Sequence, residues 1–375
     1  MKRLLITGAD GYLGSGLARS FLQNTDWSLL LWVRAVDSSA ARSKTAWLAK
    51  ELERFGDRVT FAWGDLRDEQ PFASVSRNEV GAIVHAAAVT AFNVDAVTAQ
   101  AVNVDGGRKL MKWARGCAHL QWYSHLSTVY ASGLASGLIP EEPILEAPTF
   151  GNHYEASKWA AEHALVTEFS DLPWNIFRVA TAVAHDETGY VIQSNIVHKI
   201  LHLMYGGLLP VVAGAPATPL YFVTGEFAIE TIRERSCSSD LHLVYNVCHE
   251  RADCLSFGEC IDLAYEAFQE QPGFRALRIM KPLYTEESVF MHMAEHVGMF
   301  SQGMVLHAVQ LMRPFAKQMF LDKDVQNGRL RAANPSYRAP DMRALLRRVT
   351  AELLRTSWGT GAESGASARL TASAP

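Results

Sequence analysis

Tyr154 and Lys158 stand four residues apart in the stretch YEASKWAAEHAL, which ends at residue 165. Residues with this spacing share one face of a helix, so their side chains can act together. A phenol can give a proton to an oxygen that gains negative charge, and a nearby ammonium group lowers the pKa of the phenol from about 10. The pair therefore suits the reduction of a carbonyl group, although unremarkable helices carry the same spacing.

A third polar side chain precedes this pair at the end of an apolar run. Ser127 and Thr128 close the segment WYSHLST, which is predicted to be a strand, and the helix with Tyr154 follows it. A hydroxyl group at the carboxyl end of a strand can donate a hydrogen bond to a developing alkoxide. We expect Thr128 to stabilise that oxygen, Tyr154 to protonate it and Lys158 to lower the pKa of Tyr154.

A glycine-rich turn opens the chain in LLITGADGYLGSGLA, residues 4–18. The glycines have the spacing TGxxGxxG, directly after a predicted strand and at the start of a predicted helix, which is typical of a dinucleotide site. Residues without a Cβ let the backbone approach a pyrophosphate, and the helix N-terminus offers N–H groups to the phosphates. The expected cofactor-binding residues of this turn are Thr7, Gly8, Gly11, Tyr12, Leu13 and Gly14.

The end of the predicted second strand indicates which dinucleotide binds. NAD sites place an Asp or Glu about 20 residues beyond the glycines, where it binds the ribose 2′-hydroxyl. Here Arg34 ends the strand, and a guanidinium group suits a 2′-phosphate through bidentate contact. Asp37 lies nearby and offers a ribose contact instead. NADPH is therefore the expected cofactor, and NADH is the alternative.

Two further strand ends are expected to border the cofactor. Asp65 and Leu66 follow the third predicted strand in GDL, where the carboxylate can accept from the adenine amino group. The fourth predicted strand ends in HAAAVTAF, whose small side chains permit close approach to the pyrophosphate and ribose. Tight packing between helix and sheet explains the same alanines, which are Ala86, Ala87 and Ala88.

Short apolar runs alternate with amphipathic stretches over the first half of the chain, which predicts βαβ units and a parallel sheet. We expect an α/β fold with a Rossmann-like doubly wound sheet and a smaller, mainly helical substrate-binding region interleaved at its C-terminal side. The dinucleotide-binding domain is predicted to comprise residues 1–185 and a late strand at about 241–248. The substrate-binding region comprises about 186–240 and 249–357, and a Gly-, Ala- and Ser-rich tail, 358–375, is expected to be disordered.

Composition excludes several classes of protein. A formal charge of −4 and a pI near 6.4 argue against a nucleic-acid partner. The five cysteines form no CxxC pair and no metal-ligand spacing, so we expect no metal site and a reducing, cytoplasmic setting. Residues 200–225 lack Asp, Glu, Lys and Arg, but their prolines and glycines favour loops and short strands lining a pocket over a membrane helix.

Together these motifs resemble the extended short-chain dehydrogenase/reductase superfamily. The likeness runs over residues 3–250, through TGADGYLG, GDL, HAAA, NVDGGRKLM, STVY and YEASK in that order. It implies that Thr128, Tyr154 and Lys158 are the catalytic set and that Tyr154 and Lys158 also contact the cofactor, with Lys158 on the nicotinamide ribose. Asn103, in NVDGGRKLM, is expected to be structural.

Within the superfamily, the chain is similar to the thioester reductase and fatty acyl-CoA reductase branch, in LWVRA, HAAAVTAFN and HLSTVYASG. RVATAVAHDETGY (178–190) is similar to the segment that follows the sixth strand in that branch, and 312–330 bears a fainter likeness to its closing helix. Val179 stands where proline is usual and His185 where glycine is usual, so the substrate loop differs. The resemblance implies NADPH-dependent reduction of an acyl thioester, carried on coenzyme A or an acyl carrier protein, to the aldehyde or on to the alcohol.

Other functions stay open at the level of sequence. An extended-family dehydrogenase or ketoreductase acting on a small alcohol, steroid-like or sugar-nucleotide substrate is the main alternative. A non-catalytic dinucleotide-binding protein is a minor one, against which the three intact catalytic residues argue. The methionines within 280–319 suit an acyl pocket or lid, a core or homodimer face, or contact with a membrane surface; they are Met280, Met291, Met293, Met299, Met304, Met312 and Met319.

Overall fold

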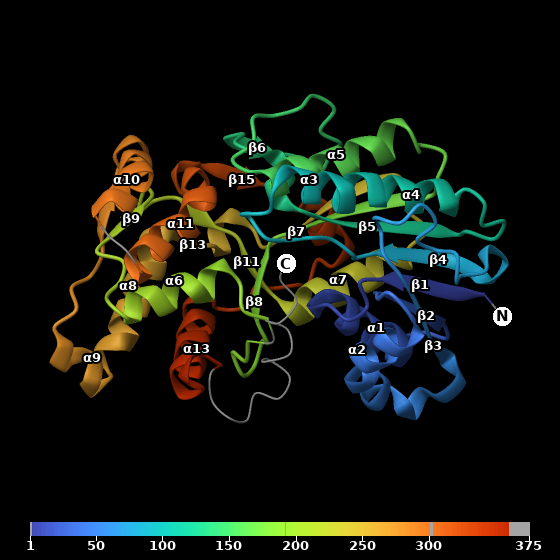
Figure 1. Ribbon diagram of the computed structural model, residues 1–375, viewed down its shortest axis with the longest axis horizontal. Coiled ribbons are helices and arrows are strands. Elements are labelled where there is room, and N and C mark those ends of the chain that lie inside the picture. Colours follow the sequence, from blue (N-terminus) through green and yellow to red (C-terminus); the bar gives the residue numbers. More distant parts are fainter. Residues whose placement is uncertain (1, 192, 301–302, 360–375) are drawn as a thin grey trace.

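The structure is a computed structural model that describes residues 2–191, 193–300 and 303–359. Its centre is a seven-stranded parallel sheet with the strand order β12-β7-β5-β4-β1-β2-β3 (Figure 1). The order reverses beside β1, which confirms the predicted doubly wound fold. In chain order the strands are β1 (Arg3–Thr7), β2 (Ser28–Arg34), β3 (Val59–Gly64), β4 (Val80–His85), β5 (Trp122–Thr128), β7 (Trp174–Val179) and β12 (Leu243–Val247).

Helices cover both faces of this sheet (Figure 1). Successive side chains of a strand point to opposite faces, so Leu4 and Ile6 of β1 enter one apolar core while Leu5 enters the other. Helices α1 (Tyr12–Asn24), α2 (Ser38–Glu51) and α7 (Gly225–Ser236) close the first core. The second core is closed by α4 (Gly106–Ala114) and α5 (His153–Thr167).

An apolar run near the middle of the chain is divided between two strands. Residues 174–184 form β7, which ends at Val179, and β8 (Thr181–Ala184). The backbone changes partners at this point, because the Ala180 N–H donates to Val247 O at 3.0 Å whereas the Thr181 N–H donates to Tyr221 O at 3.2 Å. Strand β8 then pairs with β11 (Phe222–Thr224), outside the main sheet.

The remaining chain forms the expected mainly helical part, beside the carboxyl edge of the sheet (Figure 1). It has its own apolar core, and short paired strands link it to the sheet region. One of these pairs joins β6 (Gly137–Ile139) to β15 (Lys323–Val325), which are far apart in the chain. The main helices are α6 (Ile196–Tyr205), α8 (Phe257–Gln269), α10 (Glu287–Phe300), α11 (Met304–Ala316) and α13 (Met342–Arg355).

The uncharged segment 200–225 and the start of the tail, residue 358, differ in part from what the sequence predicted. Residues 200–205 belong to α6 instead of a loop, and the strands β9 (Val211–Ala213), β10 (Pro219–Leu220) and β11 follow. No helix in the described ranges has the length and apolar character needed to cross a bilayer. Trp358, the first residue of the expected tail, stacks on His202 with ring centroids 4.6 Å apart, and residues 360–375 lie outside the described part.

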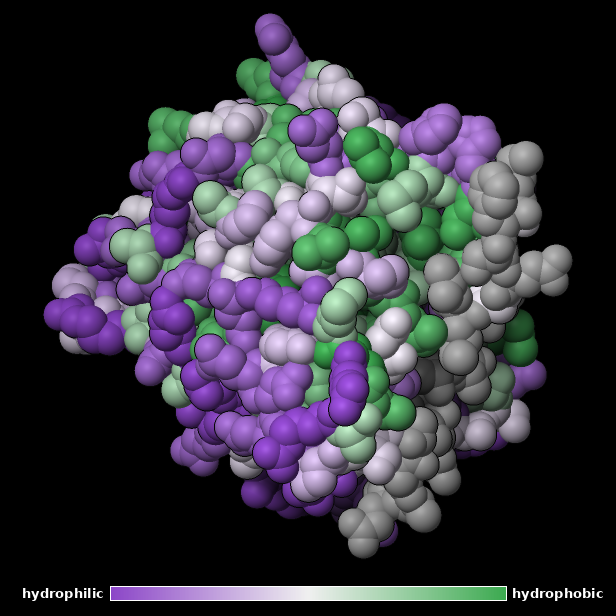
Figure 2. All heavy atoms as spheres, turned by 90° about the vertical axis from the view of Figure 1, so that its left-hand side faces the viewer, coloured by the Kyte–Doolittle hydropathy of each residue, from purple (hydrophilic) through white to green (hydrophobic). Residues whose placement is uncertain are grey.

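The methionine-rich segment 280–319 divides between the core and the surface. Met312 and Met319 are buried in the core of the helical part, and Met291 packs against it. Met280 and Met293 are exposed. Figure 2 faces the end of the molecule that the helical part forms, and on this face apolar and polar groups are interspersed. The side chains of Met299 and Met304 lie outside the described residues. A core role therefore holds for part of the segment.

Candidate active site

A cavity of about 480 Å³ opens at the carboxyl ends of β1, β4 and β5, where the helical part meets the sheet. This is where ligands bind in open α/β sheets. The cavity gathers side chains and backbone from both halves of the chain. Of the residues predicted to bind the cofactor or to act in catalysis, its wall contains Gly8, Gly11, Tyr12, Leu13, Gly14, Ala86, Ala88, Thr128, Tyr154 and Lys158.

The glycine turn has the close approaches that require glycine. Gly8 adopts a φ of +65°, and a Cβ there would lie 2.8 Å from backbone atoms of Ala87. A Cβ on Gly14 would lie 2.1 Å from Gly8 O. Gly11 is the N-cap of α1 and offers no side chain to its first N–H groups, which are therefore available to a ligand. The turn fits the phosphates of a dinucleotide.

Three predicted cofactor residues stand behind this wall. Thr7 is fully buried: its Oγ1 lies 2.8 Å from His85 Nδ1 and accepts from the Ala87 N–H at 3.2 Å. Thr7 therefore holds the end of β4 against β1, and Ala87 is held by it. Leu66 is buried in the core beneath α4. In this structure none of the three lines the cavity.

The residues expected at the adenosine end lie along the edge formed by β2 and β3. Arg34 is exposed at the end of β2, outside the cavity wall. Both carboxylate oxygens of Asp65 accept from the Arg67 side chain, which lowers the pKa of Asp65. Asp37 caps α2 by accepting from the Ala40 N–H at 2.8 Å. Arg34 thus presents its guanidinium group at the strand end where the ribose 2′-phosphate of the dinucleotide is expected.

Tyr154 lies in the first turn of α5, whose N-cap Asn152 accepts from the Glu155 N–H at 3.0 Å. It is buried against the ring of Phe92, with centroids 5.3 Å apart. Burial raises the pKa of Tyr154 above its ordinary value, and a hydrogen bond with Thr128 opposes this only in part. In the cofactor-free chain burial outweighs any lowering by Lys158, so the lowered pKa expected from Lys158 together with an oxidised nicotinamide stays a prediction.

Lys158 occupies the next turn of α5, and a main-chain oxygen of β5 holds its side chain. Its Nζ donates to Leu126 O at 2.6 Å, which anchors α5 on the end of β5. Burial lowers the pKa of Lys158 to about 8, against the opposing effect of Glu162. Burial thus dominates both groups, while Thr128, Tyr154 and Lys158 do meet in one cavity as predicted.

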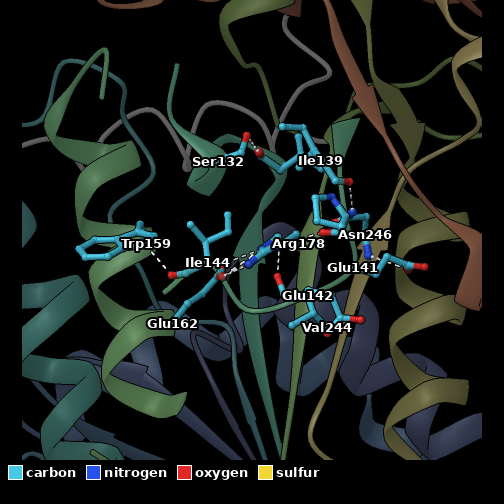
Figure 3. Close-up of polar contacts among 12 residues, drawn as sticks. Ser132, Ile139, Glu141, Glu142, Ile144, Trp159, Glu162, Arg178, Val244 and Asn246 are labelled. Atoms are coloured by element: carbon cyan, nitrogen blue, oxygen red, sulfur yellow. Dashed lines mark hydrogen bonds and ion pairs between the residues drawn. The ribbon is translucent and has the colours of Figure 1, made fainter. Parts of the chain in front are cut away.

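A buried ion pair fixes α5 on the sheet (Figure 3). Arg178 of β7 donates from Nε and Nη2 to the carboxylate of Glu162, the shorter contact being 2.7 Å, and both side chains are almost fully buried. Its Nη1 donates to Glu142 O at 3.1 Å, which ties in the loop that precedes α5. Glu162 follows Lys158 by one turn, so the ion pair sets the position of the helix face that carries Tyr154 and Lys158.

Asn103 links the loop after β4 to the same helix. Its Oδ1 accepts from the Val89 N–H at 2.8 Å, and its Nδ2 donates to Val89 O and to Ser157 Oγ, at 3.0 and 2.9 Å. It lies in a widened helical turn, Gln100–Asp105. These contacts suit the structural role expected for Asn103.

Aromatic and hydroxyl side chains that were not among the predicted site residues lie in or beside the cavity. The ring of Phe92 packs edge-on against Tyr154 and Tyr130. Phe315 of α11 packs edge-on against Phe92 and Tyr130. The Tyr130 hydroxyl lies 3.2 Å from Thr181 Oγ1. The Ser127 hydroxyl lines the cavity and has no hydrogen-bond partner within the described ranges. Tyr130 and Ser127 were within reach through STVY, whereas no motif marks Phe315.

The two departures from the usual substrate-loop pattern have definite places. Val179, which stands where proline is usual, is the last residue of β7 and lines the cavity. His185 follows β8, and its Nε2 lies 3.1 Å from the carboxylate of Glu226. Glu226 in turn accepts from the Asp186 N–H at 3.1 Å. His185 thus fastens the loop to the start of α7.

Comparison with known families decides the relationship. The family model described as "Male sterility protein", an NAD-binding family, matches residues 6–232, more than half of the chain. The chain belongs to this family. It is therefore an NAD(P)H-dependent oxidoreductase of the extended short-chain type, within the branch that the sequence resembles.

Two relatives are similar to part of this chain. The isonitrile lipopeptide synthase of Streptomyces coeruleorubidus is 30% identical over 225 residues, which are 56% of this chain and 15% of that protein. The probable fatty acyl-CoA reductase 5 of Arabidopsis thaliana is 30% identical over 168 residues, 38% of this chain and 34% of that protein. The chain thus spans about a third or less of the length of these relatives.

The fold has solved counterparts. The terminal R domain from the myxalamid PKS-NRPS biosynthetic pathway superposes with a TM-score of 0.72, at 18% identity, over 97% of this chain and 93% of that one. At this identity the likeness concerns the fold. It supports the assignment of the seven-stranded sheet and the helical part to one Rossmann-like architecture.

Proposed function

We propose that this protein reduces an acyl thioester with NADPH to the aldehyde, and on to the alcohol where a second reduction follows. The observation that carries the proposal is the single cavity in which the glycine turn meets Thr128, Tyr154 and Lys158. The names of the relatives, a fatty acyl-CoA reductase and a lipopeptide synthase, support the substrate class. The thiol partner is coenzyme A or an acyl carrier protein.

The nicotinamide supplies the hydride when it is bound. The chain must then deal with the negative charge on the substrate oxygen. Thr128 donates a hydrogen bond to that oxygen, and Tyr154 protonates it. The resulting hemithioacetal collapses: its C–S bond breaks, the hydroxyl proton passes to the sulfur, and thiol and aldehyde are released. The raised pKa of Tyr154 serves this direction of reaction, because a tyrosine that keeps its proton at neutral pH is ready to donate it. Lys158, fixed on Leu126 O, holds the ribose side of the cavity.

The rings of Phe92 and Tyr130 give the acyl part an apolar wall beside the proton donor. Such a wall excludes water, which strengthens the hydrogen bonds made to the reacting oxygen. On the cofactor side, the exposed guanidinium group of Arg34 suits the 2′-phosphate, so we assign NADPH as the reductant.

The test is the consumption of NADPH by the purified protein with acyl-CoAs of increasing chain length, with the same acyl groups on a carrier protein, and with a free ketone. Aldehyde or alcohol identified by mass spectrometry with a thioester alone supports the proposal. Turnover of the ketone and not of the thioester would instead establish the ketoreductase alternative.

Tyr154→Phe tests the assigned proton donor. Loss of a general acid lowers kcat by roughly a hundred- to ten-thousand-fold, while NADPH binding should persist. Tyr205→Phe is the matched control, because Tyr205 packs in the core of the helical part, away from the cavity wall. Full thioester turnover by Tyr154→Phe would refute the mechanism.

A further inference from the structure

Helix α10 carries three potential metal ligands on one face, outside the active site. His292, Glu295 and His296 have the spacing i, i+3, i+4, and one ligand atom from each lies within 4.8 Å of the other two. Side chains three and four apart on a helix are neighbours on its surface. Ligand atoms around a tetrahedral zinc ion lie roughly 3.3 Å apart, given bonds of about 2.0 Å, so small side-chain rotations close the site.

The orientation of His296 favours metal binding. Its Nδ1 lies 2.9 Å from the main-chain oxygen of His292, and in that hydrogen bond the Nδ1–H donates. This contact fixes the tautomer and leaves the Nε2 lone pair free. Metal-binding histidines are usually held in this way, through the second ring nitrogen and a carbonyl oxygen. The rings of His292 and His296 already lie 4.3 Å apart between centroids.

The three side chains face away from the core. Phe290 and Ala294, on the opposite face of α10, are buried in the core of the helical part, whereas His292 and Glu295 are exposed and His296 is half-buried. Within the described ranges no ion pair engages Glu295, and no other group of His, Cys, Asp and Glu comes together in this way. Other carboxylates of the helical part are paired, as Asp262 is with Lys281 and Glu259 with Arg343.

We propose that His292, Glu295 and His296 form a binding site for a divalent transition-metal ion, with Zn²⁺ as the natural fit. Two imidazoles and one carboxylate suit zinc and its neighbours in the series, whereas Mg²⁺ and Ca²⁺ prefer oxygen ligands. Three protein ligands leave a position for water. The ion joins successive turns of α10, which packs on α11, the helix that supplies Leu311 to the cavity wall. It therefore rigidifies this cover and takes no part in hydride transfer.

The experiment measures Zn²⁺ binding to the tag-free, full-length protein by equilibrium dialysis and calorimetry, with Mg²⁺ as the hard-ion control. We expect one ion per chain at this site, a Zn²⁺-dependent rise in Tm and slower hydrogen exchange in α10. Co²⁺ should give the visible absorption bands of a nitrogen- and oxygen-ligated ion. None of these readouts depends on the proposed reductase activity.

His292→Ala combined with His296→Ala should weaken binding at least tenfold and abolish the Zn²⁺-dependent rise in Tm. His307→Ala is the matched control, since His307 is an exposed histidine on the neighbouring helix α11. Both variants should match the wild-type Tm in the presence of a chelator, because the replaced side chains are at the surface. Unchanged binding by the double variant, or no binding by the wild type, overturns the proposal.

Discussion

Burial acts in opposite directions on two neighbouring groups of α5. It raises the pKa of Tyr154 and lowers that of Lys158 to about 8. In both cases the neutral form gains, because the apolar surroundings penalise charge. For Tyr154 this keeps the proton that the proposed reaction needs. For Lys158 it places titration closer to neutral pH than for an exposed lysine, which makes its charge measurable.

The lowered pKa of Lys158 predicts a pH-dependent contribution to the stability of the cofactor-free protein. Between pH 8 and 10.5 the unfolded chain keeps a lysine proton that the folded chain has lost, so this contribution to the free energy of unfolding rises with pH. Urea unfolding should show the stability of the wild type, relative to Lys158→Met, growing by about 3 kcal/mol across that window. Lys112→Met removes an exposed lysine of α4 and is the control for the loss of one positive charge.

Arg34 should decide between the two nicotinamide dinucleotides. Hydrogen bonds to a charged group contribute about 1.5–3 kcal/mol, so Arg34→Ala should weaken NADPH binding tenfold or more and leave NADH binding nearly unchanged. Fluorescence titration with both dinucleotides measures the ratio. Arg54→Ala, also exposed but after α2, controls for the loss of one positive charge. Equal losses for NADPH and NADH would place the 2′-phosphate elsewhere.

At the scale of elements, the turn between β1 and α1 separates two uses of glycine. A Cβ on Gly14 meets the backbone of Gly8 at 2.1 Å, while a Cβ on Gly11 comes no nearer than 3.3 Å to Gly8 O. Gly14→Ala should therefore lower the free energy of unfolding by about 1–3 kcal/mol or more. Gly11→Ala should lower Tm less than Gly14→Ala, because its Cβ makes a tight contact and not an overlap, and it should weaken NADPH binding, because Gly11 lines the cavity. Similar losses of Tm in both variants would contradict this division.

Elements with strong local patterns were predictable. The alternation of apolar runs and helices predicted the parallel sheet, and the motifs predicted which strand ends share one cavity. The break at Ala180, between β7 and β8, was not predictable, because the flanking residues are largely apolar and the backbone changes partners only between Ala180 and Thr181. Thr7 and Leu66 were placed on the cofactor by their motifs, yet their side chains face the core. The aromatic wall depends on Phe315, which tertiary packing alone brings to Phe92.

For the whole molecule, the late part of the chain closes the site that the early part builds. β15 pairs with β6, and Gln318 donates from Nε2 to the carboxylate of Glu155 at 2.9 Å, next to Tyr154. Lys323 donates from its buried Nζ to Gly133 O at 2.6 Å and to Ser132 Oγ at 3.0 Å. The position of Tyr154, the proposed proton donor, therefore depends on residues that follow it by more than 150 places in the chain.

This connection predicts that Lys323→Met destabilises both parts together. Removing the ammonium group takes the donor from Gly133 O and Ser132 Oγ and leaves the buried Glu155 less compensated, at a cost of roughly 1–3 kcal/mol. Adding Glu155→Gln should recover part of this loss, with a coupling energy of about 0.5–3 kcal/mol in a double-mutant cycle. Lys281→Met, which breaks a surface pair with Asp262, is the matched control and should cost about 1 kcal/mol or less.

Urea unfolding followed by fluorescence and by far-ultraviolet circular dichroism should give one coincident transition in every variant. Separate transitions for the sheet and the helical part in Lys323→Met, or additive effects of the two substitutions, would show that the two parts are not coupled through Lys323 and Glu155.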